Sequence, residues 1–180
     1  MTSLKETVVS IDARDDKDRV VDLLISQLKA YGYDIVEVNL DKPWGAYIRI
    51  SNDYADTFIA EFFPGLDPLE ARLGNTSVAL SPKLLIVSPG QRLSWQYHYR
   101  RAERWRFLTS GSYNKSLNDE PGQPVDVVAD EVVQFKAEER HRLNGKESGY
   151  VVVAEIWQHI DAMDASDEDD IVRLSDDYKR

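Results

Sequence analysis

The chain has 180 residues, no cysteine and a formal net charge of −10. Its mass of 20.6 kDa is that of one domain with a substantial core. The lack of cysteine excludes thiolate metal sites and thiol catalysis, and the acidic balance argues against binding to a nucleic-acid backbone. Because the N-terminus lacks a signal-peptide pattern and no apolar run reaches the roughly 18 residues of a membrane span, we expect a cytoplasmic protein without a membrane partner.

The first forty residues contain one clear helical pattern. A short apolar run at residues 7–11 predicts an edge strand. From residue 16 to residue 31 apolar side chains recur at helical spacing, and Gly32 is placed for a C-terminal cap. We expect this helix to pack on a sheet, with a partner-binding groove as the alternative use of its apolar stripe. Residues 1–40 are thus expected to pack on a main domain, residues 41–180, within one structural unit.

The next segment mixes clear and ambiguous patterns. Residues 35–38 read as a strand, and residues 41–50 form a turn with a Pro-Trp-Gly sequence that leads into another strand. Residues 57–63 fit either a strand or a helix. Asp67 is a helix N-cap residue followed by proline, which predicts a short helix over residues 69–73.

Short strands dominate the rest of the chain. A buried strand is expected at residues 82–87, and turn signals separate further strands at residues 125–129, 131–135 and 150–158. Many short strands with a single N-terminal helix predict an all-β, mainly antiparallel barrel or sandwich.

The stretch from residue 88 to residue 111 carries the candidate chemistry. Gln96 and His98 stand two apart in a β-rich segment, so a strand would direct both to one face. Glu103 heads a second alternating run. If the short connection folds that run back on the first, the three side chains converge, and His141 is the candidate fourth partner. Two imidazoles and two oxygens suit one divalent ion, zinc first, with iron, nickel, cobalt or manganese as alternatives.

Other interpretations of this stretch remain open, both for the candidate ligands and for its arginines. The same side chains fit ordinary polar positions on a half-exposed hairpin, with no metal. The stretch also gathers several arginines, which can mark a pocket for an anionic small molecule. Solvated faces of the hairpin account equally well for two of them, Arg104 and Arg106.

The stretch also keeps a fixed spacing of distinctive residues: Pro89-Gly90, Arg92-Leu93-Ser94, Gln96, His98, Arg101-Ala102-Glu103, Trp105 and Gly111. This pattern resembles the metal-binding motif of the cupin domain of type II mannose-6-phosphate isomerases. The resemblance implies a cupin, or double-stranded β-helix, barrel with one N-terminal helix, and it assigns Gln96, His98, Glu103 and His141 to the metal.

The resemblance runs from Lys42 to the end of the chain, interrupted at residues 52–80 by a segment longer than the family's, either a surface addition or a lid. The nucleotidyltransferase half that accompanies many such cupins is missing. Sugar-nucleotide synthesis is therefore not expected.

The function implied by the resemblance is metal-dependent aldose–ketose isomerisation of a sugar phosphate, first of all mannose 6-phosphate to fructose 6-phosphate. Resemblance and position point to Arg101 and Lys83 as catalytic cations, and we expect substrate binding by Arg92, Tyr99 and Arg173. No residue stands out as the general base. The expected partners are a phosphorylated sugar and, through edge strands, a second copy of the chain.

Several positions depart from the family pattern. Tyr99 and Arg100 stand where the family commonly has His-His, Arg104 replaces another histidine, and Lys42 replaces the arginine of Arg-Pro-Trp-Gly. Lysine keeps the charge but loses the bidentate fork. These departures favour the alternative function, a cupin module that binds a metal or a sugar without turnover.

Overall fold

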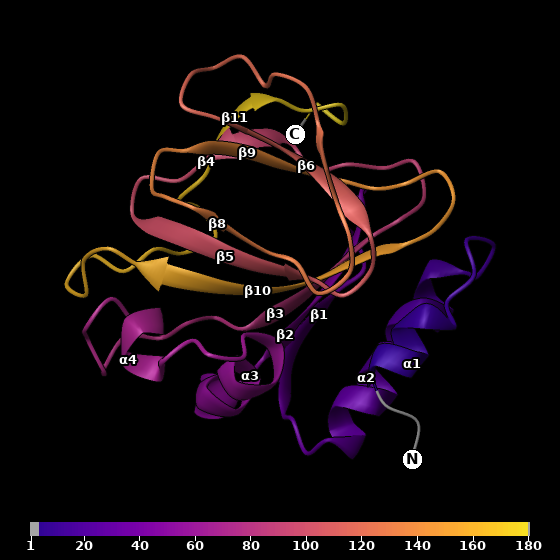
Figure 1. Ribbon diagram of the computed structural model, residues 1–180, viewed down its shortest axis with the longest axis horizontal. Coiled ribbons are helices and arrows are strands. Elements are labelled where there is room, and N and C mark those ends of the chain that lie inside the picture. Colours follow the sequence, from indigo (N-terminus) through magenta and orange to yellow (C-terminus); the bar gives the residue numbers. More distant parts are fainter. Residues whose placement is uncertain (1–3, 180) are drawn as a thin grey trace.

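A computed structural model describes residues 4–179 as two antiparallel sheets that face each other (Figure 1). The six-stranded sheet contains, in spatial order, β1 (Ile35–Asn39), β2 (Gly45–Ile50), β3 (Lys83–Val87), β10 (Val151–His159), β5 (Arg101–Phe107) and β8 (Val132–Phe135). The five-stranded sheet contains β11 (Val172–Ser175), β4 (Trp95–Tyr97), β9 (Arg140–Asn144), β6 (Gly111–Ser116) and β7 (Val125–Val127). The predicted all-β, antiparallel class is confirmed.

The helices lie on the outer face of the six-stranded sheet (Figure 1). They are α1 (Leu4–Val9), α2 (Lys17–Ala30), α3 (Ala55–Phe62) and α4 (Pro68–Ala71), with a 3₁₀ turn at Asn52–Tyr54. Among residues 4–179, no helix is both long enough and apolar enough to cross a membrane. The segment over residues 52–80 covers the outer face, so it is not a lid over the space between the sheets.

The helix predictions met different outcomes. The expected helix at residues 16–31 is confirmed as α2, whose N-cap Asp16 accepts a hydrogen bond from the backbone N–H of Asp18. The short helix after Asp67 is confirmed as α4, and residues 57–63, left ambiguous, fall mostly within α3.

The edge strand expected at residues 7–11 and the single N-terminal helix are both wrong. Residues Leu4–Val9 form α1, a second N-terminal helix. Leu4 and Val8 are four positions apart, and both are buried in the apolar cluster that includes α2. Burial of this helical face outweighs the weak strand preference of a β-branched segment.

Alternation along the strands divides the buried side chains into two cores. On β3, Leu84 and Ile86 pack under the helices in the outer core, whereas Leu85 and Val87 point between the two sheets into the inner core. β10 is buried along its whole length and alternates in the same way. The central strands β3 and β10 are therefore buried on both faces, and the inner face of the sheet lies toward the interior of the barrel.

The hairpin expected around residues 96–108 is a further correction. β4 pairs with β9 and β11, whereas β5 pairs with β10 and β8, so the two segments belong to facing sheets. The carboxylate of Asp170 accepts hydrogen bonds from the backbone N–H groups of Tyr99 and Arg100, 3.0 Å each. This anchor holds the connection as a crossing between sheets, because those N–H groups are no longer available for a hairpin ladder.

Candidate metal centre and its cavity

His98, Glu103 and His141 meet between the two sheets. The Nε2 atom of His98 lies 3.1 Å from Oε1 of Glu103, and Nε2 of His141 lies 3.3 Å from Oε2. One ligand atom of each residue falls within 4.8 Å of the others, and all three side chains are buried. Glu103 comes from β5 of one sheet, His141 from β9 of the other, and His98 follows β4 directly. The predicted convergence therefore occurs across the barrel.

Backbone carbonyls orient both imidazoles. Nδ1 of His98 lies 2.5 Å from the carbonyl oxygen of Asp170, and Nδ1 of His141 lies 2.9 Å from that of Glu139. A carbonyl only accepts, so each Nδ1 carries the hydrogen and each Nε2 turns a lone pair toward Glu103. Nε2 of His141 is buried and has no hydrogen-bond partner among the described residues. Two lone pairs facing a carboxylate fit a cation between them.

The protonation states of these groups also fit a metal. Burial lowers the pKa of His98 against the opposing pull of Glu103, which favours the neutral imidazole that can ligate an ion. Burial pushes the pKa of Glu103 upward, but the neighbouring His98, Arg101 and His141 outweigh it and hold that pKa well below its usual range. The cluster thus offers an ionised carboxylate beside neutral imidazole nitrogen.

Gln96, the fourth predicted ligand, lies beside this cluster. It is the cross-strand partner of His141 in the pairing of β4 with β9, and its side chain is nearly buried. Its Oε1 atom accepts a hydrogen bond of 2.5 Å from Ser94 Oγ. An amide oxygen has two acceptor positions, so one remains for an ion.

Arg101 is the positive charge next to the cluster. Its Nε donates to Oε1 of Glu103 at 2.9 Å, and its Nη2 lies 3.2 Å from Nε2 of His98. Nη1 donates to Ser166 Oγ at 2.8 Å, and the guanidinium stacks 3.6 Å from the centroid of the Trp157 ring. This buried cation balances Glu103 and faces the same space as the candidate ligands.

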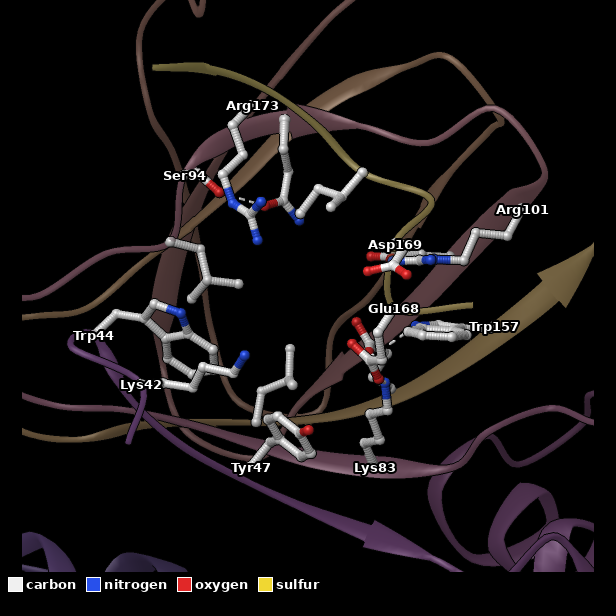
Figure 2. A pocket seen from close by; sticks show the side chains of 16 residues that line it. Lys42, Trp44, Tyr47, Lys83, Ser94, Arg101, Trp157, Glu168, Asp169 and Arg173 are labelled. Carbon is white, nitrogen blue, oxygen red and sulfur yellow. Dashed lines mark hydrogen bonds and ion pairs between the residues drawn. The ribbon is translucent and has the colours of Figure 1, made fainter. Parts of the chain in front are cut away.

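A cavity of about 440 Å³ opens beside the cluster, and Figure 2 shows its walls. Glu103 joins the two features, because it contacts both histidines and also lines the cavity. The lining includes four cations: Lys42, Lys83, Arg101 and Arg173. It also includes four carboxylates, Glu103, Glu155, Glu168 and Asp169, and three aromatic rings, Trp44, Tyr47 and Trp157.

The cations of the cavity differ in their partners. Lys83 pairs with Glu168 at 2.7 Å and lies 3.5 Å from the centroid of the Trp157 ring. Lys42 and Arg173 extend into the cavity from opposite sides (Figure 2). Within residues 4–179 neither of these two forms an ion pair. They are therefore the cations best placed to meet an anionic ligand.

Gly45 explains how Lys42 and Trp44 come to the cavity wall. Its φ of 151° lies in the region that favours glycine, and a Cβ atom there would collide with the carbonyl oxygen of Ile86. Only glycine lets β2 approach β3 so closely. The Pro-Trp-Gly turn noted in the sequence thus fixes one edge of the cavity.

Two predicted substrate-binding residues lie outside the cavity. Arg92 pairs with Asp177 at 2.7 Å, and its side chain is 46% exposed. Tyr99 is half exposed, with its hydroxyl 2.9 Å from that of Tyr97. The structure therefore places Arg173, Arg101 and Lys83 in the cavity wall, but not Arg92 or Tyr99.

Sequence reasoning missed Glu155. This carboxyl is buried in the cavity wall on the inner face of β10, and its two oxygens accept hydrogen bonds from the indole N–H groups of Trp105, at 3.0 Å, and Trp157, at 3.1 Å. Burial, reinforced by the charge of Glu103, raises the pKa of Glu155 to about 8. The available signal was a single carboxylate within an otherwise apolar strand, residues 151–157.

Comparison with known proteins gives a family and a fold. The family model described as "Mannose-6-phosphate isomerase C-terminal" matches residues 75–176. No curated protein matches the chain in sequence.

Three solved structures are similar to the chain. The capsular polysaccharide assembling protein CapF from Staphylococcus aureus is 13% identical, with a TM-score of 0.53 over 88% of this chain and 38% of that one. CapF with the inhibitor 3-isopropenyl-tropolone is 13% identical, with a TM-score of 0.51 over 96% and 45%. A Cupin 2 conserved barrel domain protein from Salinispora arenicola is 16% identical, with a TM-score of 0.46 over 71% and 83%. The chain spans less than half the length of the CapF chains, and the likeness to CapF shows the fold alone.

Proposed function

The chain belongs to the mannose-6-phosphate isomerase C-terminal family and has its cupin fold, and on that premise we propose that it is a metal-dependent aldose–ketose isomerase of a sugar phosphate. The first substrate pair to consider is mannose 6-phosphate and fructose 6-phosphate. The observation that carries the proposal is the buried cluster of His98, Glu103 and His141, which Glu103 connects to a cavity rich in cations.

The proposed cofactor is one divalent ion held by His98, Glu103 and His141, with Gln96 as the fourth ligand. Nitrogen and oxygen donors without thiolate suit zinc first, and iron, nickel, cobalt or manganese as alternatives. When bound, such an ion supplies Lewis-acid polarisation of the substrate's carbonyl and hydroxyl oxygens.

The chain's own cations divide the remaining work. Arg101 would donate hydrogen bonds to substrate oxygens that gain negative charge during the reaction, and Lys83 adds a second positive charge to the same wall. Arg173 and Lys42 would bind the phosphate, because they extend into the cavity and form no ion pair within the described chain. Arg92 is the weaker choice, since its charge is already paired with Asp177.

The second candidate function is a cupin module that binds a metal or a sugar without turnover. The observation that favours it is the use made of Arg100, at a position where the family commonly has histidine. Its guanidinium binds Asp164 and Asp167 of the acidic segment near the C-terminus, at 3.1 and 2.9 Å. Arg100 thus stabilises that acidic segment and does not line the cavity.

Elemental analysis combined with a coupled assay tests the proposal. We expect about one divalent ion per chain in the native protein, loss of the ion in His98→Ala and His141→Ala, and formation of fructose 6-phosphate from mannose 6-phosphate only with the ion present. His159→Gln is the matched control, since His159 is buried but accepts from the backbone N–H of Ser166 outside the cluster. Bound metal without conversion of any sugar phosphate would leave only the binding module.

A further inference from the structure

Aldose–ketose isomerisation requires a group that carries a hydrogen between two neighbouring carbons, and neither the metal ligands nor the cations of the cavity supply one. We propose that Glu155 is this group: its carboxylate removes the hydrogen from C2 of the aldose phosphate and returns it to C1. This inference rests on the proposed function and names the residue that performs its central step.

The sheet register places Glu155 on the wall that faces the substrate. Along β10 the inner-facing positions include Val153, Glu155 and Trp157, and Glu155 pairs in register with Lys83 of β3 on one side and Trp105 of β5 on the other. Two residues further along, Trp157 pairs with the candidate ligand Glu103. Neighbouring positions of an antiparallel pair share a face, so the proton carrier and the metal ligand line the same cavity.

Two indoles fix the direction of the carboxyl group. Trp105 Nε1 donates to Oε1 of Glu155 at 3.0 Å and also lies 3.2 Å from Oε2 of Glu103, while Trp157 Nε1 donates to the other oxygen of Glu155 at 3.1 Å. Indole N–H groups are neutral and cannot accept a proton. They hold the group in place in both protonation states, and each carboxylate oxygen keeps a further lone pair.

The charges around Glu155 leave it able to take up and release a proton. Lys83 of β3 pairs with Glu168, and Arg101 of β5 pairs with Glu103, so no cation forms an ion pair with Glu155 within the described chain. Burial raises the pKa of Glu155 above the usual range of a glutamate, although Lys83 and Arg101 oppose the rise. A proton carrier works best when its pKa lies near the working pH.

The other carboxylates of the cavity are less suited. Glu103 is the proposed metal ligand, and Glu168 is held by Lys83. Asp169 lies on an exposed turn at the cavity edge. Within residues 4–179, Glu155 is the one carboxylate of the four that is buried and forms no ion pair with a cation.

The proposed step balances without a further reactant. A carboxylate oxygen of Glu155 forms a bond to the hydrogen of C2. The electron pair of the C2–H bond then becomes the second bond between C1 and C2, and the π electrons of the C1 carbonyl move to O1. The proton of the C2 hydroxyl then passes from O2 to O1. Finally the double-bond pair takes the hydrogen from Glu155 to C1, while a lone pair of O2 re-forms a carbonyl at C2.

The test follows deuterium uptake from heavy water into mannose 6-phosphate and fructose 6-phosphate by NMR, with metal-loaded native protein, Glu155→Gln and Asp169→Asn. Glu155→Gln is expected to keep its metal and its folded circular dichroism spectrum but to lose exchange and isomerisation by about 1000-fold. Asp169→Asn, which removes a carboxylate from the edge of the same cavity, is expected to retain far more exchange and isomerisation than Glu155→Gln, since Asp169 makes none of the contacts used above.

The outcomes separate the two proposals. If Glu155→Gln exchanges and isomerises at the native rate, Glu155 is not the carrier and the isomerase function stands. If the metal-loaded native protein neither exchanges nor converts any sugar phosphate, both proposals fall.

A second measurement needs no variant and so does not depend on the folding of Glu155→Gln. The probe is 1,2-anhydromannitol 6-phosphate, whose epoxide is opened by the carboxylate that faces C2 and forms an ester. Peptide mass spectrometry is expected to find that ester on Glu155. An ester on Glu168 or Asp169, or no ester at all, would overturn the assignment.

Discussion

The two faces of the six-stranded sheet differ in the side chains that they bury. On the outer face, Leu84, Ile86 and Ile156 pack in an apolar core under the helices. On the inner face of the same strands, Lys83 and Glu155 are buried in the wall of the cavity. Along one strand, an outward-facing residue of the apolar core therefore alternates with an inward-facing residue that can line the cavity.

This difference bears on how the fold offsets the free-energy cost of the charged groups inside the barrel. Burying charges is costly unless they are paired or hydrogen-bonded, and the inner face carries several of them. The outer core, by contrast, gains free energy from apolar area removed from water. The inner face also buries apolar side chains such as Leu85 and Val87, and we infer that the outer core helps to offset the cost of the charges in the cavity wall.

The largest expected effect concerns the pH dependence contributed by Glu155 in the metal-free protein. Its pKa is about 8 in the folded chain against 4.5 for an ordinary glutamate, so between these values the unfolded state binds fewer protons and the free energy of unfolding falls as pH rises. Glu155→Gln removes this slope while Lys83, Arg101 and Glu103, which face the group, remain.

Chemical denaturation of both proteins at pH 5 and pH 8 measures this contribution. The stability of the native protein relative to Glu155→Gln is expected to fall on the order of 3 kcal/mol between the two pH values. Equal slopes for the two proteins would show that Glu155 ionises normally.

The next effect tests the outer face. Leu84 is completely buried in the outer core, so Leu84→Ala is expected to lower the free energy of unfolding by about 3 kcal/mol, because it removes apolar contacts and leaves a cavity. The metal content of the folded variant should stay at the native level. Denaturant unfolding and elemental analysis check both statements, and loss of the ion from folded Leu84→Ala would show that the two faces are not independent.

The smallest effect concerns the cations near the rim. Arg92→Ala is expected to cost under about 1 kcal/mol of stability, because its ion pair with Asp177 is exposed, and to leave binding of mannose 6-phosphate unchanged. Arg173→Ala should instead weaken that binding about tenfold, since Arg173 lines the cavity. Isothermal titration calorimetry compares the two. A larger loss of binding in Arg92→Ala than in Arg173→Ala would assign the phosphate to Arg92 instead.

The sequence predicted the elements whose local signals agree with their surroundings. Asp16 and Gly32 bracket a helix with a regular apolar stripe, and Asp67 with the following proline marks a short one. The convergence of His98, Glu103 and His141 was also predicted, from their residue types and from the resemblance of the surrounding motif to a known family.

The rest depends on contacts between distant segments. Thr7 to Val9 favour a strand locally, but Leu4 and Val8 bury a helical face against α2. No local signal shows that β4 and β5 join different sheets, because the anchor of their connection is Asp170, some seventy residues away. Glu155 stayed unnoticed for a related reason: its pKa and its indole partners exist only once β10 lies between β3 and β5.

The candidate ligands come from both sheets, with Glu103 on one and His141 on the other. An ion bound by both residues would cross-link the two sheets of the barrel. Its binding affinity would therefore depend on the distance between the sheets. Replacing a packing residue of the inner core, such as Phe135 or Leu143, would change that spacing and with it the affinity, although neither is a proposed ligand. Selection on metal affinity can therefore act through the packing of the barrel while the ligands stay the same.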